Sequence, residues 1–268
     1  MLLPTAATTS ALEQILHSIP QDVWHSVWHP SSTAILSRVS KSMHATVSAL
    51  RLPATLRMSR DWWLSGTHLT GRTKWVIALE RLNTLAASAT LTSVALHCGS
   101  QAWGLVAFCE AHPRLHASLQ HFSLTSNGNL GPTGTAEVAR ALRTCTAITD
   151  LELSRNDVRA AGVCSLTPVL LTFPHLRRLA LAKNALGDSG VTAVATGLHL
   201  CAALDTLDLS GNAMQAGGAI ELANHIRSFS QLTHLDVGHN HMQNLGAEIL
   251  SHALAHLSIR HLDFSDNR

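Results

Sequence analysis

The stretch LDTLDLSGNAMQAGG, Leu204 to Gly218, contains a pattern that the chain uses repeatedly. Its apolar residues are Leu204, Leu207 and Leu209, and Asn212 follows three residues after the last of them. A period of 27 to 29 residues indicates that one supersecondary unit is stacked along the chain. The pattern begins at seven positions: Leu91, Leu119, Ile148, Leu176, Leu204, Leu232 and Ile259.

Each unit continues from its asparagine into a helical pattern. A glycine follows the asparagine by about six residues, as Gly190 and Gly218 do, and an apolar run at helical spacing comes next, for example Val191, Val194 and Leu198. The unit is therefore predicted to be a short strand, a tight turn and a helix.

These units resemble the leucine-rich repeats of the ribonuclease-inhibitor type over residues 91–268, as about seven repeats with an incomplete last one. The resemblance implies an α/β fold, a right-handed leucine-rich repeat solenoid in the shape of a horseshoe arc. Parallel strands would line the concave face and helices the convex face, with an N-terminal helical module ahead of them. The leucines of one unit would stack on those of the next.

The repeated asparagine is expected to be structural. In the family that the repeats resemble, its amide satisfies backbone groups of the turn, and its loss would leave buried polar groups unpaired at about 1–3 kcal/mol. The residues concerned are Asn127, Asn156, Asn184, Asn212, Asn240 and Asn267.

The side chains that alternate with the leucines are the candidates for binding a protein partner on the concave face. The candidate set is Glu152, Arg178, Asp208, Asp236, Asp263, His234, His261, Arg155 and Lys183. Three aspartates at one offset predict a column of like charges at neighbouring strands. Two interpretations stay open: an acidic docking strip for a basic partner, or solvated aspartates that are ordinary at this offset.

The N-terminal part is built differently, and residues 12–50 read as two helices. The segments IPQDVWHSVW, Ile19 to Trp28, and LSRVSKSM, Leu36 to Met43, resemble an F-box, although the spacing is about three residues short and Met43 replaces the usual aromatic residue. The resemblance implies docking on a Skp-type adaptor of a cullin ubiquitin ligase. The contacting residues would be Ile19, Pro20, Val23, Val27, Leu36 and Val39.

The alternative for residues 12–50 is a helical cap over the first repeat, which a solenoid requires. Residues 51–90 are expected to form an irregular capping repeat, with a first strand in LPATLRM, Leu52 to Met58. The run Gly218 to Ala223 also resembles the GALA-type F-box effectors of plant-pathogenic bacteria. That resemblance would place the protein in a host cell.

Composition favours a soluble intracellular protein. The five cysteines are scattered without a CxxC motif, so neither a disulfide framework nor a zinc site is expected. No basic, apolar leader and no run of 18 apolar residues is present, so no membrane role is expected. The net charge of +2 gives no reason to expect nucleic acid as a partner.

Catalytic and metal motifs give no positive signal. The sequence His239-Asn240-His241 imitates a nuclease motif, but Asn240 is the repeat asparagine. His252 and His256 lie four apart without a third ligand, so no metal and no cofactor is expected. The chain is interpreted as a non-enzymatic interaction protein.

Three functions remain open from the sequence. The first is an F-box adaptor that recruits a substrate, the second a plain repeat scaffold or inhibitor, and the third a regulator similar to the Ran GTPase-activating protein. Because Leu262 and Phe264 have no following helix, the natural protein is expected to continue beyond Arg268.

Overall fold

The computed structural model describes the backbone of residues 54–58 and, with side chains, residues 91–96, 109, 112–113, 115–125 and 130–267. The chain divides into two compact units, Met1–Leu50 and Arg51–Arg268. The first unit lies outside the described residues, so the F-box-like segment stays a prediction.

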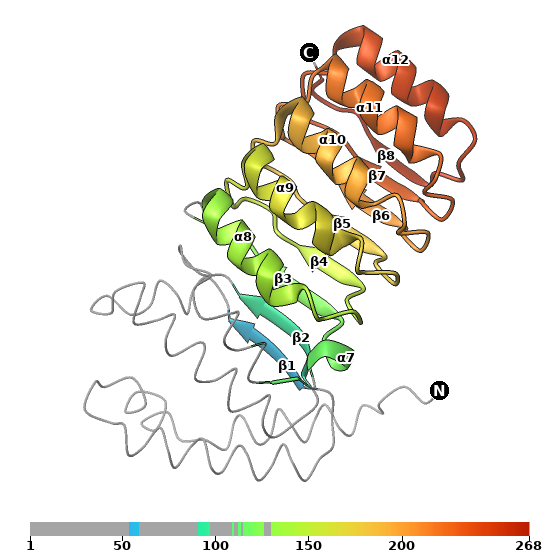
Figure 1. The fold of residues 1–268 in the computed structure, drawn as a ribbon. Coiled ribbons are helices and arrows are strands. Elements are labelled where there is room, and N and C mark those ends of the chain that lie inside the picture. The colour runs from blue at the N-terminus through green and yellow to red at the C-terminus, as the bar shows by residue number, and fades with distance from the viewer. Residues whose placement is uncertain are drawn as a thin grey trace, which may run out of the picture. The chain divides into compact units, whose positions relative to one another are not determined.

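The second unit contains one parallel sheet whose eight strands follow one another in chain order (Figure 1). Sequential parallel strands require a crossover connection in every unit, and the repeated helix supplies it. The expected strand within Leu52 to Met58 is present as β1. The strands are β1 (Ala54–Met58), β2 (Leu91–Leu96), β3 (His121–Leu124), β4 (Asp150–Glu152), β5 (Arg178–Ala180), β6 (Thr206–Asp208), β7 (His234–Asp236) and β8 (His261–Asp263).

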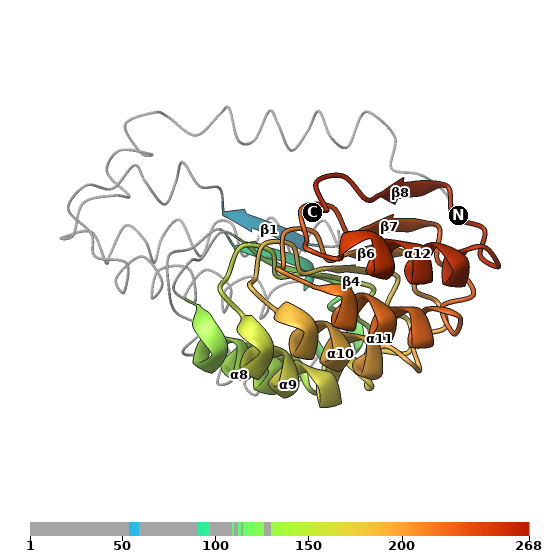
Figure 2. The same ribbon diagram turned by 90° about the horizontal axis from the view of Figure 1, so that it is seen from above.

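The helices from α8 onward lie together on one side of the sheet (Figure 2). They are α8 (Gly131–Leu142), α9 (Arg159–Leu170), α10 (Gly187–Gly197), α11 (Ala216–Ile226) and α12 (Gln243–Leu254). The predicted α/β solenoid, with strands on the concave face and helices on the convex face, is confirmed.

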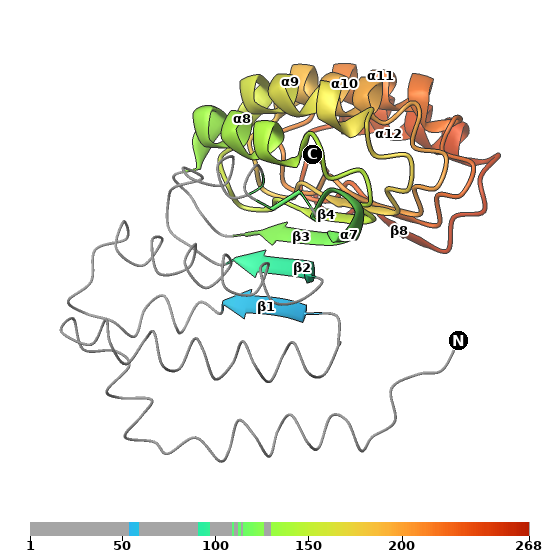
Figure 3. The ribbon, with the colours of Figure 1, turned by 60° about the horizontal axis from the view of Figure 1, so that its bottom comes forward.

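A shorter helix, α7 (Leu115–Ser118), precedes β3. The Ser118 hydroxyl donates to the backbone oxygen of Leu91 in β2 over 2.9 Å. Figure 3 shows α7 beside the three strands β1, β2 and β3, which lie next to one another as their pairing requires.

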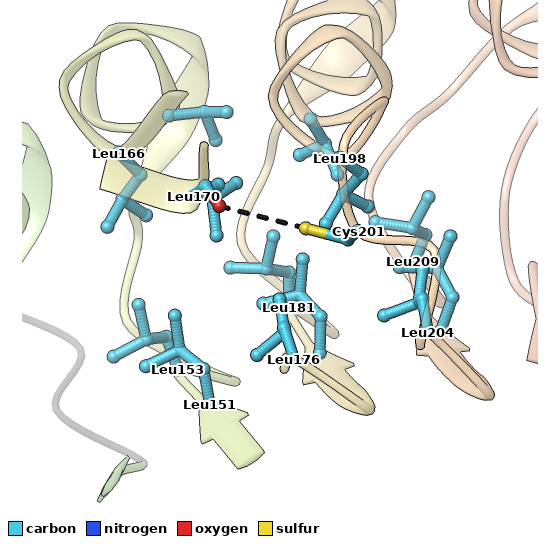
Figure 4. Packing of buried hydrophobic residues seen from close by; sticks show 14 of the residues in the cluster. Leu151, Leu153, Leu166, Leu170, Leu176, Leu181, Leu198, Cys201, Leu204 and Leu209 are labelled. Atoms are coloured by element: carbon cyan, nitrogen blue, oxygen red, sulfur yellow. Dashed lines mark hydrogen bonds between the residues drawn. The ribbon is translucent and has the colours of Figure 1, made fainter. Parts of the chain in front are cut away.

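The core lies between the sheet and the helices and is continuous from repeat to repeat (Figure 4). The middle residue of each strand points into it: Leu151, Leu179, Leu207 and Leu235 occupy one register and are 0% exposed. Because equivalent leucines of neighbouring repeats stack on one another, the stacked repeats bury an apolar face that a single repeat would leave exposed.

The buried asparagines form a ladder along the turns that follow the strands. The Asn212 amide nitrogen donates to the backbone oxygens of Leu181 and Leu209, each over 2.9 Å, and its Oδ1 accepts the backbone N–H of Asn184 over 2.9 Å. Asn240 repeats this arrangement one unit later and accepts the Asn212 N–H.

The ladder agrees with the structural role predicted for Asn156, Asn184, Asn212, Asn240 and Asn267. Each of their amides bonds one or more carbonyl groups of its own turn or of the preceding strand. Asn127 lies outside the described residues.

Helix α11 begins differently from its neighbours. Gly187, Arg159 and Gln243 open their helices with a positive φ of 60°, 56° and 55°, whereas Gln215, which precedes α11, is extended at φ −100°. The Gln215 N–H donates instead to Asp188 Oδ1 over 2.6 Å. A carboxylate of one repeat therefore caps the helix of the next.

Candidate functional site

Two columns of side chains lie on the face of the sheet opposite the helices. Because β4 to β7 bury their middle residue, their first and third residues lie on the opposite face, where Ala180 of β5 is itself only 1% exposed. We call this surface the strand face. Its first column is His121, Asp150, Arg178, Thr206, His234 and His261, and its second is Ser123, Glu152, Ala180, Asp208, Asp236 and Asp263.

The three aspartates are aligned in register, as the sequence predicts. Asp208 pairs with Asp236, and Asp236 pairs with Asp263, on strands that lie about 4.8 Å apart. Each of the three is partly exposed. The end of the strand face formed by β6, β7 and β8 therefore presents a continuous acidic column.

Each aspartate also has a local structural bond. Oδ1 of Asp208 accepts the backbone N–H of Ser210 over 3.0 Å, and Oδ1 of Asp236 accepts that of Gly238 over 2.9 Å. Oδ1 of Asp263 accepts the N–H of Ser265 over 2.7 Å. Aspartate side chains commonly accept such a bond from the backbone of a turn. In each aspartate Oδ1 therefore stabilises the turn, and Oδ2 takes no part in these bonds.

Gly238 makes room for the column. A Cβ at this position would lie 3.2 Å from Oδ1 of Asp263 and 3.3 Å from Oδ1 of Asp236. Because glycine has no Cβ, the carboxylates of Asp236 and Asp263 can both lie close to the backbone of residue 238.

The carboxylate in the middle of the column shows the electrostatic consequence. The pKa of Asp236 is raised, mainly by partial burial and further by the charges of Asp208 and Asp263. The pKa of Asp263, at the sheet edge, is lowered, first by its hydrogen bonds with Ser265 and to a lesser extent by His239 and His261. The repulsion predicted from the sequence is therefore strongest at the centre.

Histidines lie beside this acidic column. His234 and His261 pair across β7 and β8, and their ring centroids are 5.9 Å apart. In the turns that follow, His239 Nδ1 lies 3.0 Å from Asp266 Oδ2. Asp266 and His239 were not among the predicted site residues, although both occupy the repeat offset of Arg155 and Lys183.

The other end of the strand face carries basic groups. Arg178 lies 3.7 Å from Glu152, so that acid is partly neutralised. Arg155 and Lys183 are exposed in the turns, and the Lys183 stem lies over Gly211, where a Cβ would come within 2.9 Å of Lys183 Cγ. The strand face thus carries both signs of charge at β4 and β5, where Asp150 and Glu152 lie beside Arg155, Arg178 and Lys183, and it is acidic from β6 to β8.

Among the residues that the structure describes, no three histidine, cysteine, aspartate or glutamate side chains gather as a metal site would require. Within the same part of the chain, no helix has the length and apolarity to cross a membrane.

The comparison with protein families agrees with this architecture. Residues 174–195, 201–223 and 231–251 match the family model described as Leucine Rich repeat. The chain carries leucine-rich repeats. These three leucine-rich repeat segments run from the residues before β5 to α12.

A solved structure to which this chain is similar is the tropomodulin C-terminal domain of Caenorhabditis elegans. It is 14% identical in sequence with a TM-score of 0.42, and the match covers 50% of this chain and 82% of that chain. The comparison with curated proteins finds no match. The family match lies within residues 174–251 and does not include residues 12–50.

Proposed function

We propose that this leucine-rich repeat protein is a non-catalytic scaffold that binds another protein on its strand face. The observation that carries the proposal is the in-register column Asp208, Asp236 and Asp263. The leucines and asparagines of the same repeats are buried in the core and the turns, so they are not available to a partner. The strand face holds charged side chains that remain accessible for binding.

The chemistry of the partner follows from the charge of this surface. The β6 to β8 end attracts lysine and arginine, whereas Arg155 and Lys183 near β4 and β5 repel them. The partner segment is therefore basic where it meets β6 to β8, and the split in charge sets its position along the sheet.

The test removes the charge and keeps the fold. Asparagine at 208, 236 and 263 retains an oxygen that accepts the turn N–H groups but loses the negative charge. The triple variant Asp208→Asn, Asp236→Asn, Asp263→Asn should bind an oligolysine peptide about tenfold more weakly at low salt, measured by fluorescence anisotropy.

The matched control removes three acidic charges from the helices, with Glu137→Gln, Glu221→Gln and Glu248→Gln. It has the same net charge as the triple variant, and its affinity should stay near that of the intact chain. Equal weakening in both variants would mean that the peptide responds to net charge alone, which contradicts a site on the strand face.

A narrower proposal concerns residues 12–50. We propose that they act as an F-box, so that the chain recruits a substrate to a cullin-type ubiquitin ligase. The support is the sequence resemblance of Ile19 to Trp28 and of Leu36 to Met43. The contacts with the adaptor would come from Ile19, Pro20, Val23, Val27, Leu36 and Val39.

A pull-down against a purified Skp-type adaptor tests the narrower proposal. The intact chain should be captured, and a variant with Val23→Asp, Val27→Asp and Val39→Asp should not. Absence of capture by a folded intact chain would reduce the segment to a cap and leave the strand-face proposal untouched.

A further inference from the structure

The acidic end of the strand face is interleaved with histidines, and this gives it a charge that depends on pH. Over the three strands and turns of residues 205–211, 233–239 and 260–266, there are five acidic residues, one arginine and three histidines. The net charge of these segments is −4 with neutral histidines (1 − 5) and −1 with protonated histidines (1 + 3 − 5). Histidine is the side chain that changes its charge between about pH 5 and 8.

The histidines are placed where protonation acts on the carboxylates. His234 stands on β7 in the first column, and His261 is its partner on β8. His234 is in register with Thr206 on β6, and its Nδ1 lies 2.7 Å from the Thr233 hydroxyl. The charged and titratable residues on the adjoining segments are Asp205, Asp208, Asp236, His239, Arg260, His261 and Asp263.

The remaining histidine faces the acidic column from the turn. His239 lies 3.0 Å from Asp266 and is close enough to Asp236 and Asp263 to affect both carboxylates. When it is protonated, His239 is a cation paired with Asp266 at the end of the column. All three histidines are exposed, so protons reach them without unfolding.

We infer that binding of a basic segment to the β6 to β8 end of the strand face is pH-dependent, with capture near neutral pH and release on mild acidification. The inference rests on the proposed function. Protonation of His234, His239 and His261 places three positive charges among the carboxylates that attract the partner. Asp236 acts in the same direction, because a carboxyl with a raised pKa loses its charge earlier as the pH falls.

The experiment uses the full chain and an oligolysine peptide at low ionic strength, where charges on this scale are least screened. The affinity should fall about tenfold between about pH 7.5 and about pH 5.5, since histidine is the side chain that changes its charge between about pH 5 and 8. Circular dichroism at both pH values verifies that the chain stays folded.

The decisive variant is His234→Gln, His261→Gln, His239→Asn. Asparagine is chosen at 239 because the backbone there has a φ of 54°, which asparagine tolerates. The variant should keep the affinity at about pH 7.5 and lose most of the dependence on pH. A matched control, His199→Gln with His252→Gln and His256→Gln, removes three exposed histidines away from the strand face and should retain the dependence.

The outcomes separate the two proposals. Binding with the same affinity at both pH values overturns the inference alone. A pH dependence that persists in the strand-face histidine variant also overturns it, because the charge would then change elsewhere. No binding at either pH contradicts the proposed function itself, and the inference falls with it.

Discussion

At the scale of the residue, Asn212 shows how one side chain connects two repeats. Its amide bonds backbone groups of residues 181, 184 and 209, and the whole residue is 0% exposed. Alanine would leave the Asn184 N–H group without this partner, whereas the carbonyl groups of Leu181 and Leu209 would keep their bonds from the amides of Asn184 and Asn240. A buried polar group without a partner costs about 1–3 kcal/mol.

Asn212→Ala is therefore expected to lower the free energy of unfolding by about 1–3 kcal/mol, measured by urea denaturation. Asn224→Ala, at an exposed position of α11, is the control and should change it by less than about 0.5 kcal/mol. A loss at Asn212 no larger than that of the control would show that the ladder does not stabilise the repeats.

The cysteines differ in their exposure to reagents. Burial raises the pKa of the Cys201 thiol to about 11, and its Sγ lies 3.7 Å from the backbone oxygen of Leu170 (Figure 4). At pH 8 only about one thiol in a thousand is then the reactive thiolate. Iodoacetamide should label exposed Cys164 and spare Cys201 in the native chain, as read by peptide mass spectrometry; equal labelling would contradict the buried environment.

At the scale of the element, α11 depends on its neighbour for its N-terminal cap. Asp188 accepts the Gln215 N–H, and a Cβ at Gly217 would lie 2.8 Å from its Oδ2. Glycine at the start of α11 therefore leaves room for the Asp188 carboxylate from α10. The helix pattern alone does not reveal this, because the two partners belong to different repeats.

A double-mutant cycle tests the cap. Asp188→Ala should destabilise the chain by about 1 kcal/mol through loss of the cap. Gly217→Ala should stabilise it more in the Asp188→Ala background than in the parent, because alanine favours the helix by up to about 1 kcal/mol once the collision with the carboxylate is removed. Thermal unfolding of the four proteins gives the coupling, and strict additivity would contradict the contact.

At the scale of the whole molecule, strands β2 to β7 each have a neighbouring strand on both sides, whereas β8 is an edge strand. Leu235 of β7 is 0% exposed, whereas Leu262 of β8 is 42% exposed. The N–H of Leu209 donates to the backbone oxygen of Asp236, and the N–H of Val237 donates to the backbone oxygen of Asp263. The unit of β7 is therefore hydrogen-bonded to both neighbouring units. Stability should therefore vary along the solenoid.

Hydrogen exchange followed by mass spectrometry should find the slowest exchange in peptides that contain β5, β6 and β7, and faster exchange in the peptide that contains β8. The physical reason is that local opening of β8 breaks the pairing with one strand, whereas opening of β6 breaks the pairing with two. Uniform exchange across these peptides would mean that the solenoid opens as a single unit.

The amino-acid sequence by itself determined the solenoid. The leucine spacing within Leu204 to Asn212, repeated at intervals of 27 to 29 residues, predicts the strand, the turn, the covering helix and the structural asparagines. These features are periodic, and each is imposed by burial of the same positions in every unit. The same periodicity predicted the alignment of Asp208, Asp236 and Asp263.

Only the tertiary structure decided which side chains meet between repeats. The contact of Asp188 with the start of α11 joins residues 27 positions apart and depends on the local backbone rather than on the repeat pattern. The contact of His239 with Asp266 joins equivalent positions of neighbouring repeats, but the structure fixes its distance. The raised pKa of Asp236 likewise arises from burial and from two flanking strands. Folding brings these groups within a few ångströms, and electrostatic interactions become strong at that range.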